Sequence, residues 1–353
     1  MFLSVTWNVN PTLFEIFGRE IRWYGLLWVI GLLAAVYIVQ NIFKRENLPE
    51  KWFDSLFVYM MLGIILGARL GHCLFYEPAY YLSNPIKILK IWEGGLASHG
   101  GVIGIIIAVW LYSRNVTKKS MLWTFDRVMV PTGFTAGMIR LGNLMNHEIF
   151  GGPTDLSWGF RFVDNVPQWM HGAAPIYTEP SHPTQIYEAL IYLIIFGITM
   201  YMYYKTNAKE REGMILGVGI FLIFIARFFV EFVKNVQVDS EIAMRESTGL
   251  ILGQWLSIPF VIWGVWLIAN ALKKKPETAA IPKKNFDYTK NIKSGTIRAQ
   301  SRRQGNRAWQ YRAYRRIRSG GRTMKFHDFG ACRIESKKRY AQIRNLKSIP
   351  NSK

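Results

Sequence analysis

Long apolar segments are the feature that most constrains how this chain can fold. A helix needs about 20 mostly apolar residues to cross a bilayer, where every backbone polar group must be satisfied internally. Seven stretches come close to this requirement: 23–43, 53–75, 96–113, 124–145, 186–204, 213–233 and 253–272. The fourth contains Asp126, Arg127, Pro131 and Arg140, so we expect it to be central in the bundle or broken. The chain is therefore predicted to be an all-α integral membrane protein with about seven transmembrane helices.

The basic residues are distributed unevenly. Residues 273–353 hold 24 of the 44 Lys and Arg but only 4 of the 23 Asp and Glu, which leaves residues 1–272 with a formal charge of +1. We expect 1–272 to be the membrane domain and 273–353 to be a disordered basic tail that lies near anionic lipid. Arginines alternate with aromatic residues at 298–318, so nucleic-acid binding by the tail alone is a less favoured alternative.

The short connections between the apolar stretches predict an orientation. Residues 44–52, 114–123 and 205–212 contain nine Lys and Arg, whereas the much longer connections on the opposite side contain seven. The positive-inside rule places the dense side in the cytoplasm, so the N-terminus is predicted outside and the C-terminus inside. The segment 146–185, rich in Gly, Pro, Trp and His, then predicts an ordered extracytoplasmic loop or cap.

Ionisable groups in or beside the apolar stretches indicate where a site lies. Each charge at membrane depth costs about 2.5–3.5 kcal/mol, so it usually faces a polar cavity. Arg69 lies near the end of the second stretch, and Arg227 lies in the sixth. Arg227 and Glu231 are four residues apart and can pair on one helix, for which a purely structural ion pair is an equal alternative.

Arg140 differs because it has no acidic residue four positions away. Its polar neighbours are Asn143, Asn146 and Glu148. Gly142 could break the helix here and turn backbone N–H groups toward a ligand. The alternative is a buried arginine satisfied only by carbonyl and amide oxygens.

Two further groups of polar residues flank the stretches. Four glycines, at 94, 95, 100 and 101, surround His99, whose imidazole could act as a general base near neutral pH. A second cluster precedes the fifth stretch and consists of His182, Gln185, Tyr187 and Glu188. Helix capping and loop packing explain this second cluster equally well.

Several classes of protein have no support in the sequence. The chain lacks HExxH, GxSxG, P-loop and dinucleotide-binding motifs, and its two cysteines give no disulfide framework or metal site. Buried arginines favour an anionic oxygen ligand, and phosphate fits best. In a membrane this predicts a phospholipid head group. A carrier or binder of such head groups without turnover is the alternative, although the related halves of a typical carrier are not found.

The chain resembles the prolipoprotein diacylglyceryl transferase family over about residues 7–272. The signature RLGN-x-x-N-x-E-x-x-G is specific, and the flanking blocks occur in the same order. The matching segments are WYG at 23–25, GARLGHCLFY at 67–76, EGGLASHGG at 93–101, RLGNLMNHEIFGG at 140–152, HPTQIYEA at 182–189, RFFVEF at 227–232 and GQWLSIP at 253–259.

This resemblance implies a fold and a reaction. Members form a seven-helix bundle in the bacterial inner membrane, with the active site facing the extracytoplasmic side. They transfer a diacylglyceryl group from phosphatidylglycerol to the lipobox cysteine thiol of a prolipoprotein, and glycerol 1-phosphate leaves. The implied partners are therefore phosphatidylglycerol, the lipobox segment of the signal peptide and the bilayer, and no metal or organic cofactor is implied.

The resemblance also implies roles for residues. Arg140 and Arg227 would bind the lipid phosphate, Arg140 would stabilise the leaving group, and His99 is the candidate base or head-group positioner. Glu148 would orient Arg140 or the glycerol hydroxyls, and Glu231 would hold Arg227. The residues expected to line the substrate site are Tyr24, Arg69, Asn143, Asn146, Gly151, His182, Gln185, Tyr187, Glu188 and Glu231.

The chain departs from the family pattern at a few positions. His147 stands where a small residue is common, and we favour a loop-facing variation over an extra polar group in the site. Lys234 stands where relatives often carry arginine, which keeps the charge but loses bidentate geometry. Neither departure removes a residue that the implied mechanism needs.

Overall fold

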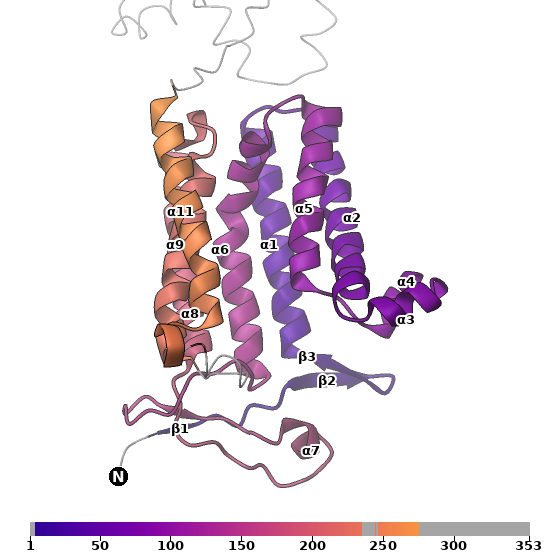
Figure 1. Ribbon diagram of the computed structural model, residues 1–353, viewed down its shortest axis with the longest axis vertical. Coiled ribbons are helices and arrows are strands. Elements are labelled where there is room, and N and C mark those ends of the chain that lie inside the picture. The colour runs from indigo at the N-terminus through magenta and orange to yellow at the C-terminus, as the bar shows by residue number, and fades with distance from the viewer. Residues whose placement is uncertain (1–3, 235–243, 245, 275–353) are drawn as a thin grey trace, which may run out of the picture. The chain divides into compact units, whose positions relative to one another are not determined.

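The computed structural model describes residues 4–234, 244 and 246–274, and its long helices run side by side between two ends of a bundle (Figure 1). Six helices are long and apolar enough to cross a membrane, which confirms the prediction of a helical membrane protein. The long helices are α1 (Trp23–Arg45), α2 (Glu50–Phe75), α5 (Ser98–Tyr112), α6 (Met121–Met145), α8 (Thr184–Lys205), α9 (Met214–Val230) and α11 (Leu252–Lys273). The predicted basic tail lies outside the described residues from position 275 onward.

Helix α6 is long enough to cross a membrane but is less apolar than the other six long helices, as expected from the charges of the fourth stretch. It packs against α1, α8 and α9, so it is central in the bundle. The alternative that this stretch is broken is wrong, because α6 continues through Pro131 and Gly142 to Met145. Asp126 stays buried within the bundle by accepting hydrogen bonds from the backbone N–H groups of Gly213 (2.7 Å) and Leu216 (2.8 Å) at the start of α9.

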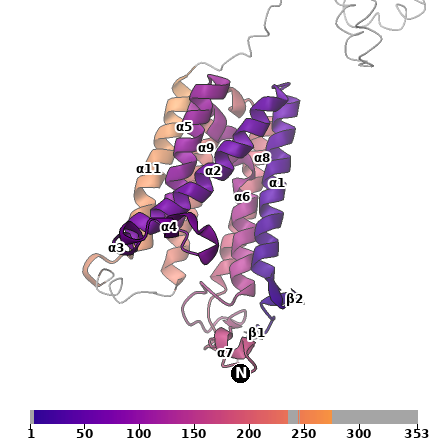
Figure 2. The ribbon, with the colours of Figure 1, turned by 90° about the vertical axis from the view of Figure 1, so that its right-hand side faces the viewer.

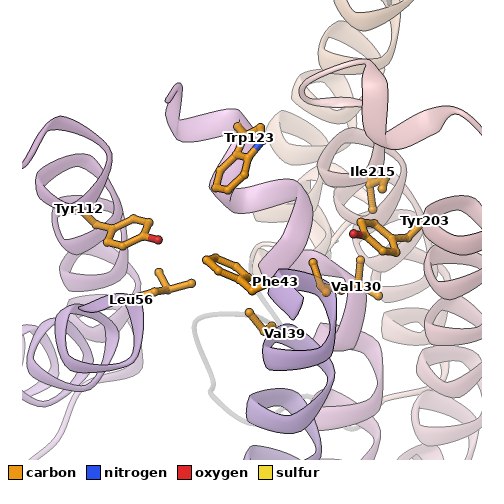
Figure 3. Packing of buried hydrophobic residues seen from close by; sticks show 9 residues of the cluster. Val39, Phe43, Leu56, Tyr112, Trp123, Val130, Tyr203 and Ile215 are labelled. Carbon is orange, nitrogen blue, oxygen red and sulfur yellow. The ribbon is translucent and has the colours of Figure 1, made fainter. Parts of the chain in front are cut away.

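One end of the bundle, which we call the closed end, is filled by large apolar side chains from six helices (Figure 3). α1, α5 and α8 end there, and α2, α6 and α9 begin there. The short elements of its connections are η2 (Ser113–Thr117) and η3 (Ala208–Glu210). The cluster contains Val39, Ile42, Phe43, Leu56, Tyr112, Trp123, Val130, Tyr203 and Ile215. This core fixes the helices at the end opposite to the candidate site.

An ion pair reinforces the closed end. Arg127 of α6 donates to Glu46 Oε2 from Nε (3.1 Å) and Nη2 (2.6 Å), and to the Trp123 carbonyl oxygen from Nη1 (2.7 Å). Its guanidinium also lies 3.6 Å from the centroid of the Trp123 ring, and the other oxygen of Glu46 accepts a hydrogen bond from the Tyr203 hydroxyl. Each charge is therefore paired, and both oxygens of Glu46 accept hydrogen bonds.

Helices α2 and α5 form a tightly packed pair because glycines line their contact. A methyl group added at Gly104 would collide with the Gly63 carbonyl, and one added at Gly67 or Gly100 would collide with the backbone of the other helix. Small residues at four-residue spacing commonly allow such close approach in membranes. Three short helices extend from the head end of this pair (Figure 2): α3 (Pro78–Ser83), α4 (Ile86–Leu89) and η1 (Ile91–Glu93).

The head covers the other end of the bundle and is built from two distant parts of the chain (Figure 1). Strand β1 (Val5–Thr6) pairs in parallel with β4 (Phe160–Arg161), and β2 (Thr12–Ile16) pairs antiparallel with β3 (Arg19–Arg22). Helix α7 (Val166–Met170) completes it. Residues 146–185, predicted as an extracytoplasmic loop or cap, contribute β4 and α7 to this head, and their side of the membrane stays a prediction. The N-terminal strands are an addition that the sequence did not indicate.

Candidate functional site

Arg140 is the centre of a buried group of charges at the head end of the bundle. It lies in the last two turns of α6, and its Nε is 3.0 Å from Glu188 Oε2 of α8. Its Nη1 donates a longer hydrogen bond to Asn143 Oδ1 (3.4 Å). The side chain of Glu188 is 2% exposed, and the adjacent cation offsets the cost of burying its charge.

Glu188 is shared between two cations. Lys234 follows the η4 turn (Glu231–Val233), and its Nζ lies 3.7 Å from Glu188 Oε1. The Tyr192 hydroxyl, one turn further along α8, is 3.5 Å from the same oxygen. Lys234 and Tyr192 were not among the predicted site residues. The four-residue spacing of Tyr192 from Glu188 is a signal that could have found it.

The predicted pair of Arg227 with Glu231 is wrong. Glu231 Oε2 instead lies 3.6 Å from Lys234 Nζ. Within the part of the chain that the structure describes, Arg227 has no ion pair and no hydrogen bond from its side chain. It lies close enough to the Tyr192 hydroxyl to act on it electrostatically, as Arg140 also does. Arg227 therefore belongs to the same group of charges but keeps a guanidinium that no described carboxylate neutralises.

Glu148 does not contact Arg140, and it orients the two signature asparagines instead. Glu148 Oε1 accepts hydrogen bonds from Asn143 Nδ2 (2.9 Å) and Asn146 Nδ2 (3.1 Å). Because Asn143 Oδ1 in turn accepts from Arg140, Glu148 acts on Arg140 only through this amide. Gln185 donates to the Glu148 carbonyl oxygen (2.8 Å), and its Oε1, like Asn146 Oδ1, is buried without a hydrogen-bond partner.

Gly151 and Tyr24 lie at two close contacts, Gly151 against His182 and Val233, and Tyr24 against Gly142. A Cβ at Gly151 would lie 2.7 Å from His182 Cβ and would also collide with the Val233 carbonyl, so only glycine lets the head approach α8 and α9 here. The Gly151 N–H donates to the His182 carbonyl (2.8 Å). Tyr24, at the start of α1, lies against Gly142, where an added Cβ would be 2.7 Å from its ring.

His182 and Tyr187 form a polar group in the head with Trp158. The Trp158 Nε1 donates to the Tyr187 hydroxyl at 3.0 Å, and His182 Nδ1 lies 3.4 Å from the same oxygen. His182 and Tyr187 are half-buried, so this group stands at the boundary between the charged cluster and solvent. Its part in substrate binding stays a prediction.

His99 lies at the same end of the bundle but on the α2–α5 pair. It is exposed, and its ring packs 5.5 Å from the Phe75 ring and 5.6 Å from the Tyr76 ring, measured between centroids. The glycines around it have structural roles: Gly100 packs against α2, and a Cβ at Gly95 would lie 2.5 Å from the His72 ring. Gly100 therefore serves helix packing, whereas Gly94 faces open space, and a ligand beside His99 stays a prediction.

Arg69 holds the segment that follows α2 through its guanidinium group. Its side chain is buried, and its guanidinium donates to five backbone carbonyls in the segment after α2, those of Lys87, Ile88, Lys90, Gly94 and Gly95. It also lies over the Tyr81 ring, 4.9 Å from the centroid. Because its donors are occupied by the backbone, Arg69 fixes this segment, and its expected contact with substrate stays a prediction.

His147 lies inside the head, away from the cluster of charges. Its Nε2 donates to the Val9 carbonyl (2.9 Å), and its Nδ1 accepts from the Val163 N–H (3.1 Å). Burial lowers the pKa of this imidazole, opposed by its hydrogen bond to Val9. The preference for a loop-packing role over an additional polar group in the site agrees with this placement.

Taken as a whole, the site offers cations in excess of the acids they contact. Arg140 and Lys234 contact Glu188 and Glu231, and Arg227 lies near the Tyr192 hydroxyl without a contact to either acid, so the five charged groups have a formal charge of +1. A single phosphodiester would balance it. Among residues 4–234 and 246–274, no group of three or more His, Cys, Asp or Glu is placed to hold a metal ion.

Comparison with known proteins gives a consistent result. A family model described as prolipoprotein diacylglyceryl transferase matches residues 11–270. A phosphatidylglycerol--prolipoprotein diacylglyceryl transferase of Porphyromonas gingivalis is 55% identical over 271 residues, which cover 76% of this chain and 95% of the relative. Proteins of the same name from Bacteroides fragilis (45% identity; 78% and 98%) and Chloroherpeton thalassium (44%; 76% and 95%) are also similar.

Proposed function

The chain belongs to the prolipoprotein diacylglyceryl transferase family, and from this we propose that it transfers the diacylglyceryl group of phosphatidylglycerol to the lipobox cysteine of a prolipoprotein. The observation that carries the proposal is the buried group of charges with one cation in excess at the head end. Relatives named as this transferase are 44–55% identical to the chain, and the similarity covers 95% of the length of each.

The reaction uses these charges in a specific way. The thiolate attacks the glyceryl carbon that bears the phosphate ester, a C–S bond forms, and the C–O bond to phosphate breaks. Glycerol phosphate leaves with one more negative charge than the phosphodiester had, and the thiol proton passes to a base. Arg140 and Arg227 stabilise the phosphate as this charge grows, because preorganised cations act most strongly in a site that excludes water.

Two buried acceptors near Arg140 suit the glycerol part of the head group. Asn146 Oδ1 and Gln185 Oε1 have no hydrogen-bond partner, and a buried acceptor without a donor is costly. A glycerol hydroxyl donates a hydrogen bond, whereas the ammonium groups of choline lipids cannot. These amides would therefore contribute to the selection of phosphatidylglycerol.

His99 stays our candidate for the proton acceptor. Its imidazole is exposed at the head end of α5, where an incoming thiol has access from the head side. Substitution of His99 by Gln tests this role. If His99 is the base, turnover of the variant should fall at neutral pH and partly recover at higher pH, where more of the thiol ionises without a base. Unchanged turnover would reduce His99 to a packing residue.

We further propose that α6 is the seventh membrane crossing and that the head faces the extracytoplasmic side of a bacterial inner membrane. Nine basic residues in the short connections at the closed end support this orientation through the positive-inside rule. A membrane-impermeant thiol reagent, applied to intact cells after removal of Cys73 and Cys332, tests it. Ala173→Cys in the head should react, whereas Arg114→Cys at the closed end should react only after lysis.

The decisive experiment for the function is a turnover assay with the purified full chain. Phosphatidylglycerol vesicles and a lipobox peptide should give glycerol phosphate together with a peptide heavier by one diacylglyceryl group. The matched controls are a peptide with serine in place of the cysteine and vesicles of phosphatidylcholine. If lipid is bound or moved across vesicles without release of glycerol phosphate, the protein is a carrier and the proposal fails.

A further inference from the structure

Lys234 connects three parts of the site. Its backbone pairs with Gly151 of the head, and its ammonium group lies between Glu188 of α8 and Glu231 of η4, at 3.7 Å and 3.6 Å. The side chain is 8% exposed, so both contacts are shielded from water and from salt. No other cation among the described residues contacts both acids.

Lys234 contacts Glu231, the acid that would otherwise be placed to pair with Arg227. Residues four apart on a helix lie close enough to pair, and the spacing of Arg227 and Glu231 meets this condition. In the structure the Glu231 carboxylate instead lies between Lys234 and the first turn of α11. A Cβ at Gly253 would be 2.5 Å from Glu231 Oε1, so this glycine makes the space that the carboxylate occupies.

From this geometry we infer that Lys234 is a positioning residue: it holds Glu231 away from Arg227, so that the Arg227 guanidinium is kept for the phosphate of the lipid substrate. The inference rests on the proposed function. Arg140 retains Glu188 as its partner whether or not Lys234 is present, so the effect of Lys234 falls on Arg227.

The test compares Lys234→Gln with the double variant Lys234→Gln/Glu231→Gln in the turnover assay. In the single variant Glu231 turns to Arg227 and competes with the lipid phosphate. The KM for phosphatidylglycerol should rise about tenfold, the factor that corresponds to one lost charge-assisted contact, and kcat should change less. The double variant removes the competing carboxylate, so its KM should return toward that of the unmodified protein.

A purely structural lysine gives the opposite pattern. If Lys234 only stabilised the fold, removal of a second charged residue would leave KM as high as in the single variant or raise it further. That result would overturn the inference, as would an unchanged KM in Lys234→Gln. Lys234→Arg is the matched control, because it keeps the charge between the two acids and should keep KM near its original value.

A second variant, Gly253→Ala, tests the position of Glu231 without a change at Lys234. Gly253→Ala forces the flexible end of Glu231 out of its place, so KM should rise, and Glu231→Gln added to it should lower KM again. This pair decides the matter if Lys234→Gln does not fold, as judged by thermal unfolding. Absence of turnover in the unmodified protein would refute the proposed function itself, whereas normal turnover without rescue refutes only the role of Lys234.

Discussion

The two ends of the bundle both bury an arginine beside a glutamate, yet the pairs have different surroundings. At the closed end Arg127 makes two hydrogen bonds to Glu46 and one to a backbone carbonyl, and it also lies over an indole ring. At the head end Arg140 makes one close contact with Glu188 and one long hydrogen bond. Arg127 uses three of its five N–H donors within the protein and is neutralised by a carboxylate held through two of them, whereas Arg140 has a single contact with its carboxylate and keeps more donors for a ligand.

The balance of charge shows the same contrast. Arg127 and Glu46 neutralise each other, and nine large apolar or aromatic residues pack around that end (Figure 3). At the head end Arg140 and Lys234 contact the two acids, Arg227 adds a third cation near Tyr192 without a carboxylate partner, and amide oxygens stay unpaired. A buried ion pair with complete partners indicates structure, whereas buried cations in excess indicate a site for an anion.

The largest effect should come from removing the closed-end arginine. Arg127→Met leaves Glu46 buried without a cation, and we expect the free energy of unfolding to fall by about 3–5 kcal/mol. Thermal unfolding in detergent measures this, with the exposed Arg114→Met as the control. Turnover per folded molecule should stay close to normal. A folded but inactive Arg127 variant would show that the closed end takes part in the reaction.

The matching change at the head end should act on turnover instead. Arg140→Ala removes a cation from the leaving phosphate, and we expect kcat to fall by about 10²–10³-fold. Because Glu188 keeps Lys234 nearby, the loss of stability should be smaller than for Arg127→Met. The exposed Arg161→Ala in the head is the control. A large loss of stability with normal turnover would reverse the assignment of the two arginines.

A third change tests the packing of α2 against α5, the helix pair that runs from the closed end to the head end. Gly104→Ala places a methyl group against the Gly63 carbonyl and should lower the free energy of unfolding by about 1–3 kcal/mol, the usual cost of overpacking. Gly197→Ala on α8 is the matched control, because nothing lies within 4 Å of its added methyl group. Since α2 and α5 carry Leu56 and Tyr112 at one end and His99 at the other, turnover should fall as well. Equal stability of the two variants would contradict the close packing of α2 with α5.

Local pattern predicted much of this fold and part of the site. The apolar stretches gave the long helices, and the charges of the fourth stretch correctly indicated a central helix. Asn143, Asn146 and Glu148 lie within a few residues of each other, so their hydrogen bonds follow from one helix end. Interactions between neighbours in the sequence depend little on how helices rotate against each other.

Choice of partner between distant helices was not predictable in this way. Arg140 pairs with Glu188, which lies 48 residues away. Spacing was insufficient even between near neighbours, because Glu231 contacts Lys234 and not Arg227. Arg69 takes its carbonyls from a segment 18–26 residues downstream. Each outcome depends on which face of a helix meets which neighbour, and a spacing of four residues only makes a pair possible. The glycines near His99 show a related limit, because close helix packing, as at Gly100, and ligand approach require the same residue.

The smallest expected effect is a loss of stability at low pH that is confined to the head. His147 accepts the Val163 N–H at Nδ1 and donates at Nε2, so a proton added at Nδ1 would break the bond to Val163. Burial lowers its pKa below the ordinary value of 6.5, so the unfolded head binds a proton more readily than the folded one. The stability contributed by neutral His147 is complete above about pH 6.5 and is lost as pH falls below it.

Hydrogen exchange at the Val163 amide measures this loss locally. Between about pH 7.5 and about pH 5.5, exchange corrected for its intrinsic rate should become faster in the unmodified protein, because the Val163 N–H is released as His147 ionises. His147→Gln should abolish this acid dependence, whereas His171→Gln, at an exposed position of the same head, should retain it. An acid effect at Val163 that persists in His147→Gln would contradict this assignment and place the sensitive group elsewhere in the protein.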